Sequence, residues 1–468
     1  MAVDPVSGLR IREKDLANLR AALFPGDNKE AVAFALCGLS QGPFGEQLLV
    51  REVIPLSSSA YRDRSGVEVT WSTIDLLPLL HRVEQEGLSL VKCHSHPGGV
   101  AEFSSLDDES DRNLLPHCYE WNSQGLHGSL VLTESHAAGR IVDETGQFQP
   151  LESIRVVGSQ LSSLIVPPAT PVDEAQRRLV QAFGEGTYTE LAGLRVGVVG
   201  ASGTGSLVIE ALVRTGVRHI VIIDPETVED VNLNRIIHST HEDVTACRQK
   251  TAVAADAMRS IGFNIEVTEI VGTLHEPGVI RALAGCDVVM GCVDNREARQ
   301  LLCRIAAFYL LPYIDTGVAI HADEDTGGIL SVNTGVHYFE PGQSFIAREV
   351  FSAEALREEV MASTDPDHHA EQVRAGYVSG VDVEKPAVMP LNMIAAGLAV
   401  NELLTRIHGY REGDDEGLSA ETFFSVDLGF ARHGTDTGLC PALAPHIGQG
   451  DCVPLLGLPA LTEKEEAA

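Results

Sequence analysis

The segment LRVGVVGASGTGSLVIEALVRTG (194–216) constrains the fold more than any other part of the chain. An apolar run of strand length leads into the glycine-rich turn GASGTGS (200–206), and the residues after it have helical spacing and end in glycine. Further apolar strands follow at 219–224, 287–294 and 312–317, with helix-length stretches between them. This alternation predicts an α/β domain with a doubly wound, Rossmann-like parallel sheet.

The first third of the chain has a different pattern, in which short apolar runs alternate with turns. It predicts buried strands at EAVAFALCG (30–38), LSLVKC (88–93) and GSLVLT (128–133), and helices at 72–85 and 105–115. The prolines of VPPATPVDE (166–174) then indicate a linker. We therefore expect an α/β domain at 1–160, a linker at 161–175, the doubly wound domain at 176–430, and a partly disordered tail at 431–468.

Two later stretches of the second domain differ from the strand–helix alternation before them. The polar residues 351–372 are expected to form a mobile excursion, and the pair His368-His369 within it is interpreted as part of a solvated loop and not as a metal site. Residues 392–409 have the spacing of a late amphipathic helix.

Charge and composition exclude several classes of function. The formal net charge of −32 repels phosphate backbones, so we expect no nucleic-acid partner. The sequence contains no apolar run of about 18 residues, so we expect no membrane span. Met1 to Arg10 lacks the pattern of a signal peptide. Nine scattered cysteines, an odd number, indicate reduced thiols in a cytoplasmic protein.

The segment HSHPGGVAEFSSLD (94–107) carries the first set of chemical groups. His94 and His96 are two residues apart at the end of an expected strand, so both can point to one side, and Asp107 follows at the end of the segment. Two imidazoles and one carboxylate leave a fourth coordination position for water, which is the arrangement of a catalytic zinc site.

Hydrolysis at such a site also needs a carboxylate that moves the proton of the attacking water. Glu30 opens an expected buried strand, where its carboxylate can be held over a metal, and Glu46 and Glu52 are nearby alternatives. Ser104 is suited to donate a hydrogen bond to the oxyanion of a tetrahedral intermediate. The spacing from Ser104 to Asp107 also fits a helix capping box, and the two roles are compatible.

A glutamate followed by H-S-H-P-x(6)-S-x-x-D resembles the motif of the JAMM (MPN-type) metallopeptidases. Members of that family cut peptide or isopeptide bonds after the C-terminus of ubiquitin or a ubiquitin-like protein. The resemblance covers roughly the first 160 residues and implies a JAB/MPN fold. It implies zinc ligands at His94, His96 and Asp107, with Glu30 as the acid/base and Ser104 in the oxyanion role.

The second set of groups begins at the glycine turn. Gly200, Gly203 and Gly205 let the backbone approach a nucleotide phosphate, and the N-terminus of the following helix favours anions. Asp224, at the end of the next strand, is placed to hold a ribose hydroxyl. An NAD-dependent dehydrogenase fits these features equally well.

The residues that follow favour ATP. Asn232 and Arg235 lie just beyond the second strand, Lys250 begins a helix, and Asp294 ends a later strand. A polyphosphate leaving group needs cations, and Mg²⁺ needs a carboxylate ligand. A hydride-transfer cofactor needs neither.

The ordered series D-x-E, N-x-x-R, K and D-N, together with the turn, resembles the ThiF/MoeB branch of the ubiquitin-activating-type enzymes over about 175–430. The resemblance implies the following placement: Asp224 and Glu226 near the ribose, Asn232 in the same nucleotide site, Arg235 and Lys250 on the phosphates, and Asp294 on Mg²⁺. The implied reaction is attack of a ubiquitin-like C-terminal carboxylate on the α-phosphate of ATP, which gives an acyl-adenylate and pyrophosphate. An arginine ahead of the first strand usually reaches into the partner subunit's site, so Arg177 or Arg178 implies a homodimer.

Three features depart from that family's pattern. Ser202-Gly203 stands where a double glycine is usual, which narrows the phosphate turn without abolishing it. No C-x-x-C pair is present, and CPALAPHIGQGDC (440–452) is interpreted as a remnant of a paired zinc site. No cysteine lies between Cys303 and Cys440, where the family's thioester cysteine falls. Either the acyl group passes directly from the adenylate to a separate thiol or amine, or Cys440 or Cys452 moves into the site and forms the thioester. We favour the interpretation that these two cysteines of the tail have no chemical role.

Together the two resemblances predict a bifunctional enzyme that uses Zn²⁺, ATP and Mg²⁺. It would process or deconjugate, and also adenylate, a ubiquitin-like protein that ends in glycine, in a bacterial conjugation system of a kind that sometimes acts in defence. A separate conjugating enzyme is implied by analogy alone. Sulfur-carrier activation with cleavage of the adduct, in cofactor or amino-acid biosynthesis, is the first alternative. A scaffold that binds ubiquitin-like tails without catalysis is the second, and a nicotinamide-dependent dehydrogenase is a distant third.

Overall fold

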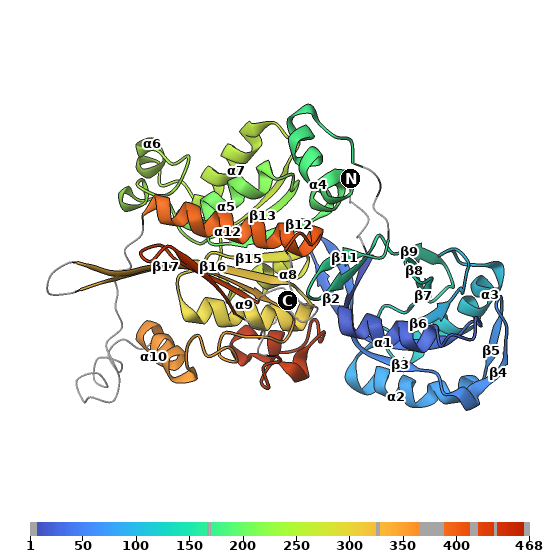
Figure 1. Cartoon of the computed structure of the whole chain (residues 1–468). Helices are drawn as coiled ribbons and strands as arrows, with labels where there is room; N and C mark the ends of the chain where they lie inside the picture. Colours follow the sequence, from blue (N-terminus) through green and yellow to red (C-terminus); the bar gives the residue numbers. More distant parts are fainter. Residues whose placement is uncertain are drawn as a thin grey trace. The chain divides into compact units, whose positions relative to one another are not determined.

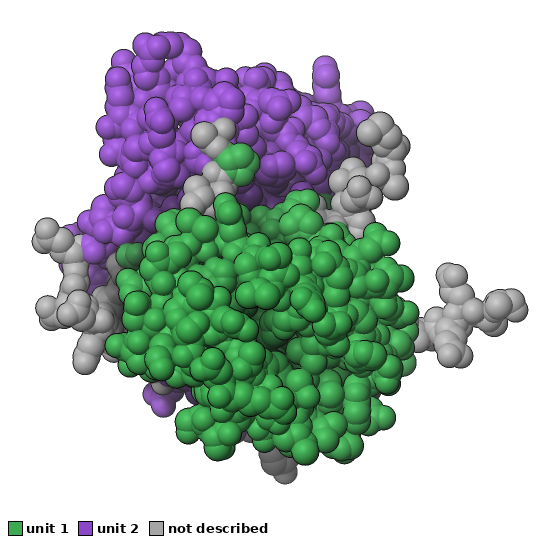
Figure 2. Space-filling view, turned by 90° about the vertical axis from the view of Figure 1, so that its right-hand side faces the viewer, with its two compact units in different colours: residues 1–168, 308–310, 446–468 green, residues 169–307, 311–445 purple. Residues whose placement is uncertain are grey.

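The computed structural model divides into two compact units. Unit 1 comprises residues 1–168, 308–310 and 446–468, and unit 2 comprises residues 169–307 and 311–445 (Figures 1 and 2). The structure describes residues 7–165, 168, 170–323, 328–364, 388–411, 420–434 and 438–462. The pair His368-His369 lies outside the described residues.

Unit 1 is built on a nine-stranded mixed sheet with the order β11-β10-β1-β3-β2-β6-β7-β8-β9. The strands have these bounds: β1 Ser7–Arg12, β2 Val32–Gly42, β3 Gly45–Pro55, β6 Ser89–Ser95, β7 Gly128–Leu132, β8 Ala137–Val142, β9 Phe148–Pro150, β10 Ser153–Val157 and β11 Leu161–Ser163. The central strand β2 is antiparallel to β3 and β6, whereas β6 and β7 run parallel. A separate hairpin pairs β4 (Tyr61–Arg64) with β5 (Val69–Trp71).

Both faces of this sheet are covered, and strand β2 shows how the sequence achieves it. Its alternate residues Ala33, Ala35 and Cys37 join one core, which also contains side chains of helix α1 (Glu13–Leu23). The intervening residues, Val32, Phe34 and Leu36, join a second core that contains Val83 of helix α2 (Leu77–Glu86). Because side chains alternate between the faces of a strand, an uninterrupted apolar run is what such a two-sided strand requires. Helix α3 (Ser105–Leu114) follows β6 in the chain.

The C-terminal segment of the chain packs within unit 1. Gly450 forms a parallel bridge with Leu39 near the end of β2, and the backbone N–H of Asp451 donates to the carbonyl oxygen of Leu39 at 2.8 Å. The Asp451 carboxylate accepts from the backbone N–H of Gln41 at 2.7 Å. A side chain at Gly38 would collide with the backbone of this segment, so the close approach requires glycine there. The described residues 438–462 include short 3₁₀ turns at Ala444–His446, Leu455–Gly457 and Pro459–Leu461, the first of which spans the boundary between the two units in the sequence.

Unit 2 is built on an eight-stranded sheet with the order β14-β13-β12-β15-β16-β17-β18-β19. Its strands are β12 Arg195–Val199, β13 His219–Ile223, β14 Glu266–Ile270, β15 Val288–Gly291, β16 Tyr313–Ala322, β17 Ile329–Phe339, β18 Glu421–Ser425 and β19 Phe430–Gly434. The first five in space, β14 to β16, are parallel, and β17, β18 and β19 extend the sheet antiparallel. The predicted Rossmann-like α/β fold is confirmed, whereas the antiparallel extension is an addition that the sequence analysis did not foresee.

Helices cover both faces of this sheet (Figure 1). Figure 1 draws α5 (Gly203–Arg214), α7 (Lys250–Ile261) and α12 (Met389–His408) on one side, and α8 (Pro277–Ala284) and α9 (Arg296–Tyr309) on the other. The remaining helices of the unit are α4 (Arg177–Gly193), α6 (His241–Thr245) and α10 (Ala353–Thr364). Within the stretch 351–372, which was expected to form a mobile excursion, residues 353–364 form the helix α10, which the sequence analysis did not predict.

Among the described residues, none of the helices combines the length and the hydropathy that a membrane span requires.

The buried imidazole of His127 makes the stability of unit 1 depend on pH. Its Nδ1 accepts from the backbone N–H of Leu90 at 3.1 Å, which requires a neutral ring with the proton on Nε2, and this Nε2–H donates to the carbonyl oxygen of Asn122 at 3.1 Å. Burial lowers the pKa of His127 to about 4. The unfolded chain, with a histidine pKa of about 6.5, therefore binds a proton that the folded chain excludes between these two values.

We predict that unit 1 loses about 3 kcal/mol of unfolding free energy through His127 as the pH falls from about 6.5 to 4, and that His127→Gln removes this part of the pH dependence. Hydrogen exchange of the β6 and β7 amides across this pH range measures the effect locally. The exposed His117 provides a control, since His117→Gln should leave the slope of unfolding free energy against pH unchanged. Equal slopes for wild type and His127→Gln would contradict the assignment.

Candidate metal centre and nucleotide turn

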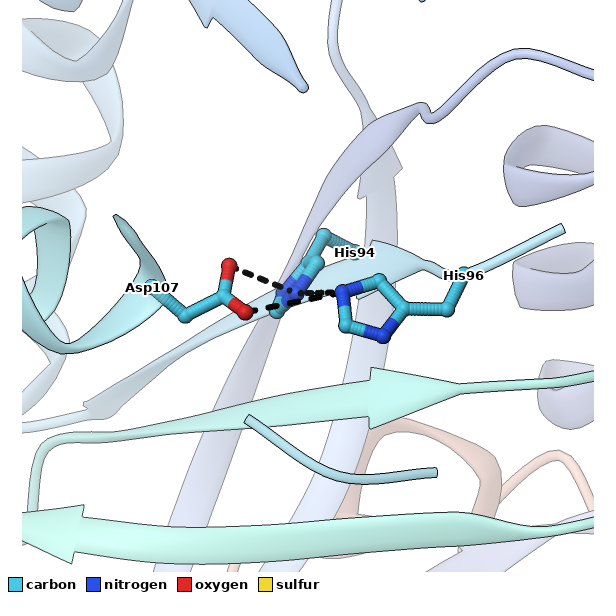
Figure 3. A group of neighbouring side chains, drawn as sticks. All are labelled: His94, His96 and Asp107. Carbon is cyan, nitrogen blue, oxygen red and sulfur yellow. Dashed lines mark hydrogen bonds and ion pairs between the residues drawn. The ribbon is translucent and has the colours of Figure 1, made fainter. Parts of the chain in front are cut away.

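Three side chains expected to bind a metal lie together in unit 1. His94, His96 and Asp107 each offer one ligand atom, and these atoms all lie within 4.8 Å of one another. The Nε2 atoms of the two histidines are 3.3 Å apart. His94 Nε2 lies 3.0 Å from Asp107 Oδ1, and His96 Nε2 lies 3.5 Å from Asp107 Oδ2 (Figure 3). Two nitrogen ligands and one carboxylate oxygen that converge in this way fit a zinc ion with a free coordination position.

Local structure explains how these residues meet. His94 lies in β6 and His96 just beyond its end, where the backbone N–H of His96 donates to the Leu132 carbonyl oxygen of β7 at 2.9 Å. Asp107 lies in the first turn of α3, which Ser104 caps. The Asp107 carboxylate accepts from the backbone N–H and the hydroxyl of Ser104, both at 2.7 Å, and the N–H of Asp107 donates back to the Ser104 hydroxyl at 3.2 Å. The capping box predicted from the spacing is therefore formed.

Burial and charge set the protonation of this cluster. Burial lowers the pKa of His94, and its Nδ1 has no hydrogen-bond partner among the described residues. The hydrogen bond to Asp107 raises the pKa of His96, whose Nδ1 lies 3.3 Å from the Val100 carbonyl oxygen. Although burial opposes it, the hydrogen bonds of both histidines hold the pKa of Asp107 well below its usual range. An ionised carboxylate beside a neutral His94 is the donor set that a divalent metal needs.

Glu30 lies next to the cluster, two residues before β2. Its Oε1 is 3.7 Å from His96 Nε2, and the side chain is largely buried. Burial raises the pKa of the Glu30 carboxyl, and the nearby Asp107 and Glu68 charges raise it further, against the opposing effect of His96. A carboxyl with a raised pKa is suited to take up and release a proton near neutral pH.

The hairpin β4–β5 holds the backbone at Glu30. The Glu30 N–H donates to the carbonyl oxygen of Ser65, and the Glu30 carbonyl oxygen accepts from Arg64 Nε, each at 2.8 Å. The alternatives raised for the acid/base role have partners elsewhere. Glu46 accepts from Gln41 at 2.9 Å, and Glu52 forms an ion pair with Arg82 at 2.8 Å.

In unit 2 the glycine turn joins β12 to α5. Gly200 has a φ of 92°, which favours glycine, and a side chain there would press on the Cys292 carbonyl group. A side chain at Gly205 would collide with the Gly200 carbonyl oxygen. Because β12 lies between β13 and β15, the turn sits where the chain order reverses, which is the ligand position of open α/β sheets. No side chain caps the N-terminus of α5, so its backbone N–H groups suit an anion.

Asp224 braces this turn from the end of β13. Its Oδ2 accepts from the backbone N–H of Ala201 at 2.7 Å, and its Oδ1 accepts from the N–H of Glu226 at 2.9 Å. Burial raises the pKa of Asp224, partly offset by these two hydrogen bonds. The structure thus gives Asp224 a local positioning role beside the nucleotide role that the sequence implied.

Two other expected nucleotide residues, Arg235 and Lys250, lie near the turn and Asp224. The Arg235 side chain packs against Gly203, at the start of α5, while its Nη1 donates to the Val231 carbonyl oxygen at 2.5 Å. Lys250, almost fully buried at the start of α7, forms an ion pair with Glu226. These contacts bring Arg235 to the turn and pair Lys250 with Glu226.

Three expected residues have other surroundings. Asn232 is buried in the 3₁₀ turn Asp230–Asn232, where its Oδ1 accepts from the Glu229 N–H at 3.1 Å. Asp294 is exposed just after β15. Arg177 begins α4 and pairs with Glu174 at 2.5 Å on the surface, so within one chain it does not reach the turn.

One residue at the turn was missed. Asn392 lies in the first turn of α12, is 3% exposed, and its amide nitrogen lies so close to Gly203 that a side chain there would collide with it. A polar residue near the start of a predicted helix was the available signal. Nothing in the sequence indicates that α12 packs beside α5, so the proximity could not be predicted.

These features define unit 2 as a Rossmann-like α/β domain with a glycine turn at its topological switch point. Residues 174–434 match the model of the ThiF family, and the chain belongs to that family.

Curated relatives are similar over part of their length. The adenylyltransferase and sulfurtransferase UBA4 of Yarrowia lipolytica is 34% identical over 140 residues, which is 30% of this chain and 34% of that protein. The SAMP-activating enzyme E1 of Haloferax volcanii is 30% identical over 147 residues, covering 31% and 54%. The sulfur carrier protein ThiS adenylyltransferase of Bacillus subtilis is 27% identical over 140 residues, covering 30% and 42%. The chain thus spans between a third and about half of the length of these relatives.

Among solved structures, Escherichia coli MccB with ATP is 18% identical, with a TM-score of 0.43, and the match covers 59% of this chain and 75% of that chain.

The ligand geometry predicts that His94→Ala and Asp107→Ala each lose one bound zinc ion per chain, because two ligands cannot hold the ion tightly. Glu30→Gln keeps the ion, since its carboxylate lies outside the three-ligand set. Metal analysis of protein purified in zinc-containing buffer measures the number of zinc ions per chain directly. His117→Ala, at an exposed histidine, is the matched control and retains zinc. Loss of zinc in Glu30→Gln, or its retention in His94→Ala, would contradict the ligand assignment.

Proposed function

We propose that unit 2 adenylates the C-terminal carboxylate of a ubiquitin-like or sulfur-carrier protein with ATP. The observation that carries the proposal is the ThiF family match over 174–434, which includes the glycine turn with Arg235 packed against it. The printed names of the relatives, which include a SAMP-activating enzyme and a ThiS adenylyltransferase, support the same class of reaction.

In this reaction a carboxylate oxygen of the substrate attacks the α-phosphorus of ATP. The bond from that phosphorus to the oxygen bridging to the β-phosphate breaks, and pyrophosphate leaves with its electron pair, so no proton is transferred. The backbone N–H groups at the start of α5 hold phosphate oxygens, while Arg235 and Lys250 offset the charge on the leaving group. Asp294, exposed at the end of β15, offers the oxygen ligands that Mg²⁺ prefers, and Mg²⁺ when bound neutralises phosphate charge.

Lys250 must then exchange partners. In the structure its ammonium pairs with Glu226, which the family resemblance places near the ribose. Nucleotide binding would draw the ammonium towards phosphate oxygens and leave Glu226 for a ribose hydroxyl. The exposed pair of Arg177 with Glu174 is weak enough to be exchanged in a homodimer, where Arg177 would reach the partner subunit's nucleotide.

We predict that Asp294→Ala and Lys250→Ala lower ATP–pyrophosphate exchange by about 100-fold or more, since each removes a charge that stabilises the departing pyrophosphate. Exchange is measured with a small ubiquitin-like protein that ends in glycine, and in parallel with a sulfur-carrier protein. Asp256→Ala, at an exposed aspartate of α7, is the control and keeps wild-type exchange. Wild-type exchange in Asp294→Ala would overturn the proposed Mg²⁺ role, and no exchange with either substrate class would overturn adenylation.

A second activity is favoured by one specific observation, the convergence of His94, His96 and Asp107 beside Glu30. We propose that unit 1 is a metallopeptidase, of the JAMM type that its motif resembles, which cleaves after the C-terminus of the same carrier protein. Zinc, when bound, would lower the pKa of a coordinated water to about 7. The Glu30 carboxylate would take a proton from the attacking water and deliver it to the leaving amine. Ser104, which caps α3, would have to turn from Asp107 to serve the oxyanion.

Two active units on one chain would act in sequence or in opposition. The peptidase would free a C-terminal glycine that unit 2 then activates, or it would remove the carrier from its targets afterwards. The alternative of sulfur-carrier chemistry uses the same two steps with a thiocarboxylate as the product. Transfer to a conjugating enzyme, or a role in defence, is a further expectation carried by the resemblance alone.

We predict that Glu30→Gln cleaves a carrier protein with a C-terminal peptide extension about 100-fold or more slowly than wild type while it keeps zinc, because only the proton transfer is lost. Cleavage is followed by mass spectrometry of the released peptide. Asp294→Ala is the control, and it cleaves at the wild-type rate. Equal rates for Glu30→Gln and wild type would exclude Glu30 as the acid/base, and a wild type that binds zinc but cleaves neither carrier class would favour a binding scaffold.

A further inference from the structure

A row of buried polar side chains crosses three strands beneath the candidate metal cluster. Lys92 of β6 is opposite Ser129 of β7, and Ser129 is opposite Arg140 of β8. All three side chains are nearly or fully buried. Charged residues are rarely buried unless they are paired, so the row requires a partner.

The partner that all three share is the carboxylate of Asp111 in helix α3, which is 0% exposed. Lys92 forms an ion pair with its Oδ1, and the Ser129 hydroxyl donates to its Oδ2. Arg140 donates to Oδ2 from Nε at 3.0 Å and from Nη2 at 2.7 Å. Arg140 also reaches Asp108 in the first turn of α3, at 2.5 Å from its Nη1.

Asp111 is the one fully buried residue of helix α3, since Leu106 is exposed and Leu114 is only partly covered. A surface helix is normally held by an apolar stripe. Helix α3 lacks such a stripe, and this ion cluster takes its place. Buried ion pairs add little net stability compared with apolar packing, but removing one partner leaves the others unpaired. The cluster instead defines the position of helix α3 relative to strand β6.

The spacing links this cluster to the metal ligands. Asp111 lies four residues after Asp107 on α3, and Lys92 lies two residues before His94 on β6, on the same face of the sheet. Four residues of an α-helix rise about 6.0 Å, and two residues of a strand rise about 6.6 Å. The contacts Asp107–His94 and Asp111–Lys92 are therefore two matched points between one helix and one strand. Two such points fix both the register and the rotation of α3.

We propose that Asp111 is a positioning residue of the metal centre: with Lys92, Ser129 and Arg140 it holds α3 so that Asp107 faces His94 before the metal binds. The inference rests on the proposed metal centre and adds to it a requirement outside the three ligands. Preorganised ligands bind a metal more tightly because the ordering is complete before binding.

The test compares the zinc affinity of Asp111→Asn with that of wild type, by competition with a chromophoric chelator on the full chain. We expect weaker binding, by at most about 10- to 100-fold, which is the range for loss of a group hydrogen-bonded directly to a metal ligand. The visible spectrum of the Co²⁺-substituted protein gives a second readout, and its bands should change as Asp107 loses its fixed position. Hydrogen exchange of the α3 amides should rise in the metal-free protein.

Asp15→Asn is the matched control. Asp15 is also a buried aspartate of unit 1, paired with Arg12 at 2.6 Å, but it lies on α1, which packs against the opposite face of the sheet. Should Asp111→Asn fail to fold, Ser129→Ala removes one hydrogen bond of the cluster and keeps its charges, and it should weaken zinc binding in the same direction.

Wild-type affinity and an unchanged Co²⁺ spectrum in folded Asp111→Asn would overturn the positioning role while leaving the metal centre intact. An equal loss of affinity in Asp15→Asn would overturn it as well, by showing a general effect of destabilising unit 1. A wild type that binds no zinc would refute the proposed metal centre itself and the inference with it.

Discussion

Parallel pairing of neighbouring strands is the constraint on which both groups of candidate residues depend. Parallel strands place their carboxyl ends on the same edge of a sheet, and the chain must leave that edge by a loop. In unit 1, β6 runs parallel to β7 and ends one residue after His94, with His96 just beyond, and antiparallel pairing with β6 brings the start of β2, near Glu30, to the same edge. In unit 2 the strands β12, β13 and β15 end at the glycine turn, Asp224 and the segment before Asp294. Apolar strands thus supply rigidity, and the residues that follow them supply the chemistry.

The two groups use burial in different ways. At the candidate metal cluster, burial favours the neutral form of His94 and raises the pKa of Glu30, so the same environment favours an unprotonated imidazole and a protonated carboxyl side by side. At the nucleotide turn the polar atoms that matter are mostly backbone N–H groups, with Asp224 bracing them. A cation binds to side-chain atoms that are already free of protons, as burial favours for His94, whereas an anion binds to backbone dipoles that need only be exposed.

The sequence predicted the arrangements whose residues lie close together along the chain, and it did not predict those whose residues are far apart along the chain. The segment from His94 to Asp107 spans one strand end and one helix start, so local spacing alone indicated that its ligands converge. The strand–turn–helix segment around Gly203 predicted the Rossmann-like core for the same reason. Asn392 and Asp111 escaped prediction because their significance depends on which elements pack together. For Asp111 that is the pairing of β6, β7 and β8, which no local pattern encodes.

The antiparallel strands β17 to β19 and helix α10 are further elements that the sequence analysis did not predict. The sequence of β17 reads as a strand only when its partner is known, since its exposed residues Ile329 and Leu330 break the alternation expected of a half-buried strand. The polar composition of 351–372 suggested a mobile excursion and gave no signal of a helix, yet polar residues form helices well on an exposed surface, as residues 353–364 do.

The place of Gly450 and Asp451 beside the end of β2 has a consequence for how the protein is made. A ribosome synthesises β2 more than four hundred residues before the segment that bonds to Leu39 and Gln41. The first unit therefore cannot reach its complete set of contacts during translation, although domains generally begin to fold in the order of their synthesis. Until the segment around Gly450 and Asp451 has been synthesised, the backbone groups at the end of β2 lack these partners.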